Sequence, residues 1–95
     1  MRRIIQYVQL RGWLVFHDER SLWNERGLPD LILTRGPRKS PQDSCARLIF
    51  AEVKATGGRL RVEQSLWLET LRHVPGVEVH VWKPADWSAI QQLLL

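Results

Sequence analysis

Four segments of the chain have the apolar pattern of β-strands. The segments LPDLILT (28–34) and RLIFAEVK (47–54) are apolar almost throughout, which is typical of strands that are buried on both faces. Residues 13–17 form a shorter apolar run, and residues 77–82 alternate between apolar and polar side chains. The pattern therefore predicts four strands.

Three further segments have apolar residues at helical spacing and predict helices over 2–10, 61–74 and 85–94. The polar stretch 18–27 and the Gly-, Pro- and Ser-rich stretch 35–46 are predicted to be loops. The resulting order, α-β-β-β-α-β-α, indicates an α/β domain with a four-stranded mixed sheet flanked by helices. We expect antiparallel pairing among the first three strands. The fourth strand should run parallel to the third, because a helix connects them.

The predicted sheet-facing side of helix 61–74 contains one polar residue. Four apolar residues define this side of the helix, and Gln64 falls among them; the four are Leu60, Trp67, Leu71 and Val74. A buried glutamine needs a hydrogen-bond partner. The nearest polar groups are at the end of strand 47–54, so we expect Gln64 to face them. A half-solvated place at the rim of the helix is the alternative.

Two carboxylates and an ammonium group lie on the two most apolar strands. Glu52 and Lys54 are two residues apart, so they project from one face of their strand at a spacing of about 7 Å. If the strand of Asp30 is the neighbour, its carboxylate repels that of Glu52 by about 4 kcal/mol at ~4 Å and an effective dielectric constant near 20. A divalent cation relieves this repulsion, which indicates metal-dependent chemistry. The alternative is a solvated Glu–Lys pair on an edge strand, but the apolar neighbours of Glu52 argue against it.

Length and composition favour one small domain that covers residues 1–95. Hydrophobic residues make up 44% of the chain and charged residues 25%, which is ordinary for a soluble protein. The single cysteine, Cys45, excludes an intrachain disulfide and a zinc site built on several cysteines, so a reducing compartment fits. No apolar run approaches the ~20 residues of a membrane span, and we expect no membrane association.

The net charge of +4 is a modest signal for nucleic-acid binding, and its distribution is more informative. Arg59 and Arg61 follow the strand that carries Glu52 and Lys54. A second basic cluster lies in loop 35–46 and consists of Arg35, Arg38 and Lys39. We expect both clusters beside the metal site, where they would hold backbone phosphates.

Aromatic residues and histidines offer weaker candidates. His17 ends the first strand near the site and is a candidate for a phosphate or water contact. Trp23, in the charged loop, is a candidate for a contact with DNA or a partner. Trp67 and Trp87 lie among the apolar residues of predicted helices and are expected in the core.

Four segments in a fixed order carry a family resemblance: GLPDL (27–31), FAEVK (50–54), GRLRVEQSLWL (58–68) and VHVWKPADW (79–87). Together they resemble the virus-type replication-repair nuclease (VRR-NUC) domain of the PD-(D/E)xK nuclease superfamily. The resemblance runs from about Gly12 to Leu94, which is nearly the whole chain.

The resemblance implies a restriction-endonuclease-like core and cleavage of DNA with Mg²⁺, for which Mn²⁺ can substitute. It implies that the metal ligands are Asp30, Glu52 and the backbone carbonyl of Val53. Lys54 would orient or deprotonate the attacking water, or stabilise charge, and Gln64 would orient Lys54 or the water. Asp30, Glu52, Lys54 and Gln64 are thus the predicted catalytic residues.

The resemblance also implies a homodimer that acts on structured or branched DNA in replication, recombination or repair. The expected location is the cytoplasm of a bacterial or phage-infected cell. Family members usually carry a glutamate in the first helix that helps to hold the metal. Here no acid precedes Asp18, and Gln6 is the only polar substitute, so either the chain begins late or fewer ligands hold the metal. The alternative hypothesis is a nucleic-acid-binding or accessory module with weak or no catalysis of its own.

Overall fold

In the computed structural model, which describes residues 1–17, 27–38 and 45–95, helices and strands follow one another in the predicted order. The elements are helix α1 (Arg2–Leu10), strands β1 (Leu14–His17), β2 (Leu31–Arg35) and β3 (Arg47–Val53), helix α2 (Val62–Arg72), strand β4 (Val77–Trp82), the short 3₁₀-helix η1 (Pro84–Asp86) and helix α3 (Trp87–Leu93). The predicted α/β class is confirmed, and the arrangement is consistent with a restriction-endonuclease-like fold.

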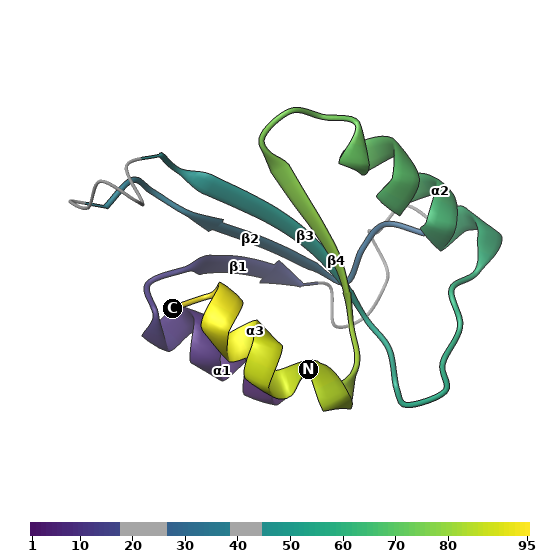
Figure 1. Ribbon diagram of the computed structural model, residues 1–95, viewed down its shortest axis with the longest axis horizontal. Coiled ribbons are helices and arrows are strands. Elements are labelled where there is room, and N and C mark those ends of the chain that lie inside the picture. The colour runs from purple at the N-terminus through teal and green to yellow at the C-terminus, as the bar shows by residue number, and fades with distance from the viewer. Residues whose placement is uncertain (18–26, 39–44) are drawn as a thin grey trace.

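The four strands form one mixed sheet in the order β1-β2-β3-β4 (Figure 1). Strand β2 pairs antiparallel with both β1 and β3, whereas β4 pairs parallel with β3. In this register Leu31 lies opposite Ala51, and Glu52 lies opposite Val81. The predicted pairing directions are therefore confirmed, and the register brings the start of β2 next to the end of β3.

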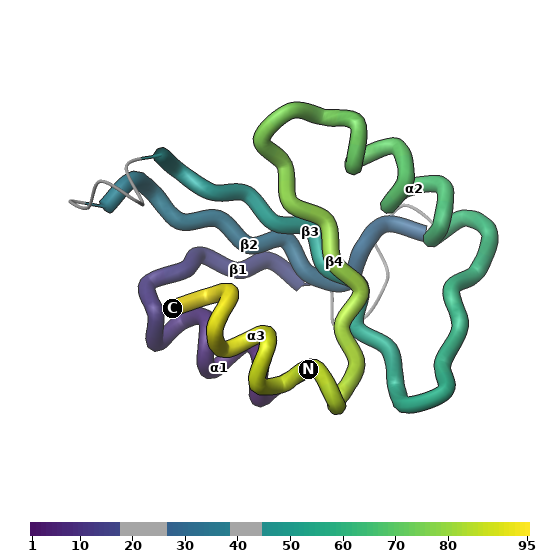
Figure 2. Tube along the Cα trace, in the orientation of Figure 1, coloured from purple at the N-terminus to yellow at the C-terminus, as the bar shows by residue number. Residues whose placement is uncertain are grey.

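The helices cover the two faces of the sheet unequally. Helices α1 and α3 pack together on one face, while α2 lies on the other face near β3 and β4 (Figures 1 and 2). The main hydrophobic core lies between the sheet and the α1/α3 pair, and it includes Val8, Leu33, Ile49 and Ile90. On the α2 face, Gln64 of the helix contacts Glu52 of β3.

Strand β2 begins three residues later than the sequence pattern predicts. Proline has no backbone N–H to donate to a sheet, so Pro29 and the bend at Asp30 precede the strand, which begins at Leu31. Asp30 consequently lies just outside the sheet, at the end where Glu52 lies.

The predicted buried side of α2 was partly wrong. Leu68 is fully buried, whereas Val74 lies beyond the end of the helix and is 45% exposed. Trp67 and Leu71 are half-buried, so the helix faces the sheet mainly through Gln64 and Leu68. These two residues are one turn apart on the same side of a helix.

None of the helices in the described parts of the chain has the length and apolar character needed to cross a membrane.

Candidate functional site

Glu52 is the most deeply buried acid among the described residues of the site. It lies near the end of β3, on the face that α2 covers, and its relative exposure is 1%. One carboxylate oxygen, Oε1, accepts a hydrogen bond of 3.1 Å from Gln64 Nε2 and lies 3.7 Å from Lys54 Nζ. A buried carboxylate requires such partners, because burial removes its hydration.

Gln64 lies in the first turn of α2 and connects the helix to Glu52. Its amide nitrogen donates to Glu52, while its Oε1 accepts a hydrogen bond of 2.8 Å from the backbone N–H of Arg61. That N–H precedes the helix, where backbone donors have no partner within the helix. The structure thus places Gln64 toward the site, as predicted, but its hydrogen bond goes to Glu52 and not to Lys54.

Asp30 approaches the end of β3 from the neighbouring strand. Its Oδ2 accepts a hydrogen bond of 2.9 Å from the backbone N–H of Val53. This contact continues the β2–β3 pairing by one step, with a side chain in place of a backbone carbonyl. It holds the Asp30 carboxylate beside the strand segment that carries Glu52 and Lys54.

The orientation of the Val53 carbonyl follows from two backbone hydrogen bonds. The N–H of Lys54 donates to Trp82 O at 2.9 Å, so it points toward β4. In a trans peptide the C=O and the N–H point in opposite directions, so the Val53 carbonyl points away from β4. Val53's own N–H points to the Asp30 side. The Val53 carbonyl, which the family resemblance implies as a metal ligand, therefore points to the same side as Asp30.

The electrostatics of the site favour a proton or a cation at Glu52. Burial raises the pKa of Glu52, the neighbouring carboxylate of Asp30 raises it further, and Lys54 lowers it in part; the resulting pKa is about 7, against an ordinary value of 4.5. Two carboxylates share one site here, and one ammonium does not fully compensate them.

A divalent cation fits the oxygen atoms that the site presents. Glu52 Oε2 is buried and has no hydrogen-bond partner within the described residues, although buried carboxylate oxygens normally have one. It lies on the carboxyl group whose other oxygen is already held by Gln64 and Lys54. Oxygen ligands from carboxylates are those that Mg²⁺ and Mn²⁺ prefer. Asp30, Glu52 and the Val53 carbonyl would hold the ion.

The set of side-chain ligands is small. Within residues 1–17, 27–38 and 45–95, no group of three or more His, Cys, Asp or Glu residues is arranged to hold a metal ion. Gln6, the predicted polar substitute for the first-helix acid, is exposed on α1. Any further ligands would come from backbone carbonyls and water, which Mg²⁺ commonly retains.

Arg59 and Arg61 lie where the sequence places them, in the segment that leads from Lys54 to α2. Both side chains are exposed, and the backbone N–H of Arg61 belongs to the hydrogen-bond chain that ends at Glu52. This placement next to the site is compatible with phosphate contacts.

Arg35 and Arg38 are not placed beside the site. Arg35 is the last residue of β2 and Arg38 follows it, whereas Asp30 precedes the start of β2, so the length of the strand separates both arginines from Asp30. Arg35 is 7% exposed and donates hydrogen bonds to the carbonyls of Leu94 and Leu95, while Arg38 donates to Leu95. The expectation that this cluster adjoins the metal site was wrong for Arg35 and Arg38, because β2 runs from the site to Arg35 at its other end.

The remaining candidates are separated from the site or lie outside the described residues. His17 ends β1 opposite Leu31, close to Asp30 along the sheet, but its register places it on the face opposite Glu52. Trp23 and Lys39 lie outside the described residues. Trp87 is half-buried and meets Tyr7 edge to face, so it contributes to the packing of α1 against α3.

Gly27 has a role that the hydrophobic pattern of the sequence did not indicate. It has a φ of +91°, and a Cβ there would lie 2.6 Å from the backbone carbonyl carbon and oxygen of Glu63 in the first turn of α2. Only glycine permits both this backbone conformation and this close approach. The close approach sets the segment that ends at Asp30 against the helix that carries Gln64. The glycine three residues before Asp30 is the signal that could have indicated it.

Comparison with known proteins identifies one family. The sequence model of the VRR-NUC domain matches residues 7–85, which is most of the chain and includes Asp30, Glu52, Lys54 and Gln64. Neither a curated protein nor a solved structure matches the chain.

Proposed function

This chain belongs to the VRR-NUC domain family, and from this membership and the site geometry we propose that it is an endonuclease that hydrolyses DNA with Mg²⁺, or with Mn²⁺ as a substitute. The family implies a nuclease-type function, DNA as the substrate and a general dependence on divalent metals. The choice of metal, internal cleavage and the residue roles below are our proposal.

One observation carries this proposal. Asp30, directly before β2, lies close to Glu52 and Lys54 at the end of the neighbouring strand β3, and Glu52 presents a buried oxygen without a hydrogen-bond partner among the described residues. A purely structural ion pair would leave no such oxygen, because an unsatisfied buried acceptor costs about 1–3 kcal/mol. A site that holds a ligand on this oxygen explains the arrangement.

The residues around Glu52 have different roles in the proposed hydrolysis of a phosphodiester bond. A bound divalent cation would supply Lewis acidity, which neutralises charge on the phosphate and acidifies water. Asp30, Glu52 and the Val53 carbonyl would hold the ion, and Gln64 fixes the rotamer of Glu52 through its hydrogen bond to Oε1. Lys54, which is close to Glu52 and partly exposed, stabilises negative charge on the phosphate or orients the attacking water.

Cleavage assays on the whole chain test this proposal. Single-stranded, duplex, flap and four-way-junction DNA would be incubated with Mg²⁺, with Mn²⁺ and with EDTA. We expect cleavage only with metal, and a loss of at least about 100-fold in Asp30→Ala, Glu52→Gln and Lys54→Ala, since each removes a ligand or a charge that acts on the transition state. Arg72→Ala, an exposed change on α2 away from these groups, is the control and should cleave normally. Full activity in EDTA contradicts the proposal.

A second candidate function is supported by the small ligand set. Because only two acidic side chains converge among the described residues, the chain could bind nucleic acid, or serve as an accessory domain, without efficient catalysis of its own. This function predicts salt-sensitive DNA binding, no metal-dependent nicking, and no heat of Mn²⁺ binding in isothermal titration calorimetry. Measurable Mn²⁺ binding that Glu52→Gln abolishes would favour the endonuclease instead.

The biological setting is also a proposal. The family resemblance supports a homodimer that acts on structured or branched DNA during replication, recombination or repair, in the cytoplasm of a bacterial or phage-infected cell. Light scattering after size-exclusion chromatography tests the dimer, and the substrate panel above tests the preference for branched DNA.

A further inference from the structure

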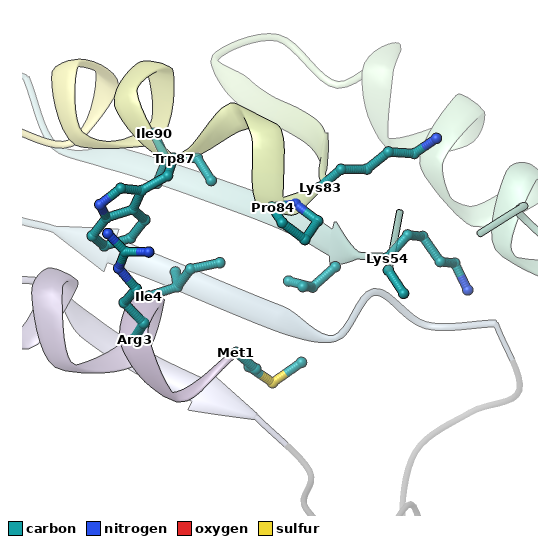
Figure 3. A pocket seen from close by; sticks show the side chains of 10 residues that line it. Met1, Arg3, Ile4, Lys54, Lys83, Pro84, Trp87 and Ile90 are labelled. Atoms are coloured by element: carbon teal, nitrogen blue, oxygen red, sulfur yellow. The ribbon is translucent and has the colours of Figure 1, made fainter. Parts of the chain in front are cut away.

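A cavity of about 470 Å³ lies at the end of β3, where Val53, Lys54 and Ala55 line it. It opens to solvent and is lined by the start of α1, the end of β3, η1 and the start of α3 (Figure 3). Val53 and Lys54 line it, so the strand segment that carries the proposed ligand carbonyl is also a wall of this cavity. Its volume falls within the roughly 300–1,000 Å³ typical of small-molecule sites.

The lining of the cavity combines apolar walls with positive charge. Ile4, Val53, Pro84, Trp87 and Ile90 supply apolar and aromatic surface. Three cationic residues also line it, and none of the described lining residues is acidic; the three are Arg3, Lys54 and Lys83. A cavity of this kind is complementary to a ligand with a flat apolar part and a negative charge.

The two kinds of group lie at different ends of the cavity. Figure 3 shows the side chains of Lys54 and Lys83 extending to one side, away from Arg3 and Trp87. At the other end the Arg3 guanidinium lies over the Trp87 ring, 4.0 Å from its centroid. Arginine planes and aromatic rings are the surfaces on which unstacked bases lie in nucleic-acid complexes. Lysine ammonium groups are common phosphate ligands.

We propose that this cavity binds one unpaired nucleotide of the DNA substrate, with its base beside Arg3 and Trp87 and a phosphate at Lys54 and Lys83. The inference rests on the proposed nuclease function, because it is Lys54 that connects the cavity to the candidate catalytic site. A paired base is enclosed within the double helix and cannot enter a cavity of this kind without leaving the stack. The substrates favoured by the cavity therefore have an unpaired nucleotide next to the cleaved bond.

The test uses DNA with the fluorescent base 2-aminopurine at a single unpaired position, bound by the whole chain in EDTA so that no cleavage occurs. Stacking in the cavity should quench the fluorescence of this base. We expect Arg3→Ala and Lys83→Ala each to weaken binding by roughly threefold to tenfold, the range that partly exposed charged contacts provide. Arg72→Ala removes the same charge from α2, outside the cavity, and should leave binding unchanged.

A second variant separates the cavity from simple charge attraction. Ala55 is exposed at the cavity, so Ala55→Trp adds bulk there without a change of charge. It should abolish the quenching and leave the affinity for fully paired duplex within about twofold, since backbone contacts dominate duplex affinity. Deoxyadenosine monophosphate should compete with the unpaired DNA, and inorganic phosphate at the same concentration should not. Equal competition by phosphate would show a phosphate site only and overturn the proposal.

Two outcomes keep this inference distinct from the proposed function. Quenching that Ala55→Trp abolishes, in a protein that cuts no DNA with Mg²⁺ or Mn²⁺, would sustain the nucleotide site and reject the nuclease. Metal-dependent cleavage without any quenching, or with quenching that Arg3→Ala and Ala55→Trp leave intact, would sustain the nuclease and reject the nucleotide site.

Discussion

At the scale of single residues, the two oxygens of Glu52 have different environments. Oε1 is held by Gln64 and Lys54, whereas Oε2 is buried without a hydrogen-bond partner among the described residues. Burial and the neighbouring Asp30 raise the pKa of this carboxyl group to about 7. A proton on Glu52 and a metal ion at Oε2 relieve the same excess of negative charge, so they compete for the site.

The raised pKa of Glu52 predicts a pH-dependent affinity for metal. Below about pH 7 a cation must displace a proton, so Mn²⁺ affinity should fall by up to about tenfold per pH unit as the solution becomes more acidic. Isothermal titration calorimetry in two buffers of different ionisation enthalpy measures this change and the release of about one proton near pH 6. An affinity that does not vary between about pH 5.5 and pH 7 would contradict the assignment of Glu52 as a ligand.

The same shift has a consequence for the stability of the metal-free protein. Because the folded state raises the pKa of Glu52 from 4.5 to about 7, the folded state holds the proton more tightly than the unfolded chain. This contribution is complete below about pH 4.5 and is lost as the pH rises through about 7, so the free energy of unfolding should fall across that window. Urea unfolding measures the effect, and Glu52→Gln, which carries no charge at any pH, should remove that dependence.

At the scale of elements, the site depends on how closely the segment before β2 approaches α2. Gly27 contacts the backbone of Glu63, and from there the chain continues through Pro29 to Asp30. Gln64, the next residue of α2, contacts Glu52. One close contact between backbones therefore sets both Asp30 and Gln64 relative to β3.

Gly27→Ala and Gly12→Ala form a matched pair of substitutions. Both glycines have positive φ, +91° and +84°, but a Cβ at Gly12 meets no atom within 4 Å. Gly12→Ala should lower the free energy of unfolding by about 1–2 kcal/mol, the conformational cost alone. Gly27→Ala adds a backbone clash and should lower it further. Thermal unfolding compares the two variants, and Mn²⁺ titration should show weaker binding only for Gly27→Ala. If both variants lowered stability and Mn²⁺ affinity equally, Gly27 would have no special role in positioning the site.

The sequence predicts the type of each element better than its orientation. The mixed sheet was predictable because hydrophobic patterns and connection rules leave few arrangements. The buried side of α2 was not, because Leu66, Trp67, Leu68 and Leu71 place apolar residues around much of the helix and the pattern has no clear phase. Packing against β3 and β4 selects Gln64 and Leu68 as the buried residues.

At the scale of the whole molecule, the two ends of the β2–β3 pair differ: one end carries the candidate site and the other holds the end of α3. One end carries Asp30 and Glu52, and the other carries Arg35, whose guanidinium donates to the carbonyls at the end of α3 and lies over Trp13. A loop sequence rich in Arg and Lys does not reveal whether a given arginine faces solvent or the end of a helix. The difference depends on where α3, nearly sixty residues away in the sequence, packs. The clustering of charge was therefore visible in the sequence, but its position relative to the site was not.

This structural role of Arg35 can be separated from nucleic-acid binding by a substitution that keeps its charge. Arg35→Lys removes the hydrogen bonds that a planar guanidinium makes and its stacking on Trp13. It should lower the free energy of unfolding by about 1–3 kcal/mol while DNA affinity stays unchanged. Chemical unfolding and fluorescence anisotropy with labelled DNA give the two readouts. If Arg35→Lys weakened DNA binding and left stability unchanged, Arg35 would instead be a contact for DNA phosphates.

Charge at the other end of the β2–β3 pair should determine how strongly DNA binding depends on salt. Arg59 and Arg61 are exposed beside the site, so DNA bound there would contact them directly. DNA affinity falls with salt, and the plot of log affinity against log salt becomes less steep by about 0.9 for every duplex phosphate that the protein no longer neutralises. Arg59→Ala and Arg61→Ala should each reduce the slope by about this amount, and Arg72→Ala, which removes an exposed arginine from the end of α2, should leave it unchanged. Anisotropy titrations in EDTA over a series of salt concentrations measure the slopes without cleavage. If Arg72→Ala changed the slope as much as Arg59→Ala, the DNA would be attracted by the overall charge of the protein, and its path would not be set by the site at the end of β3.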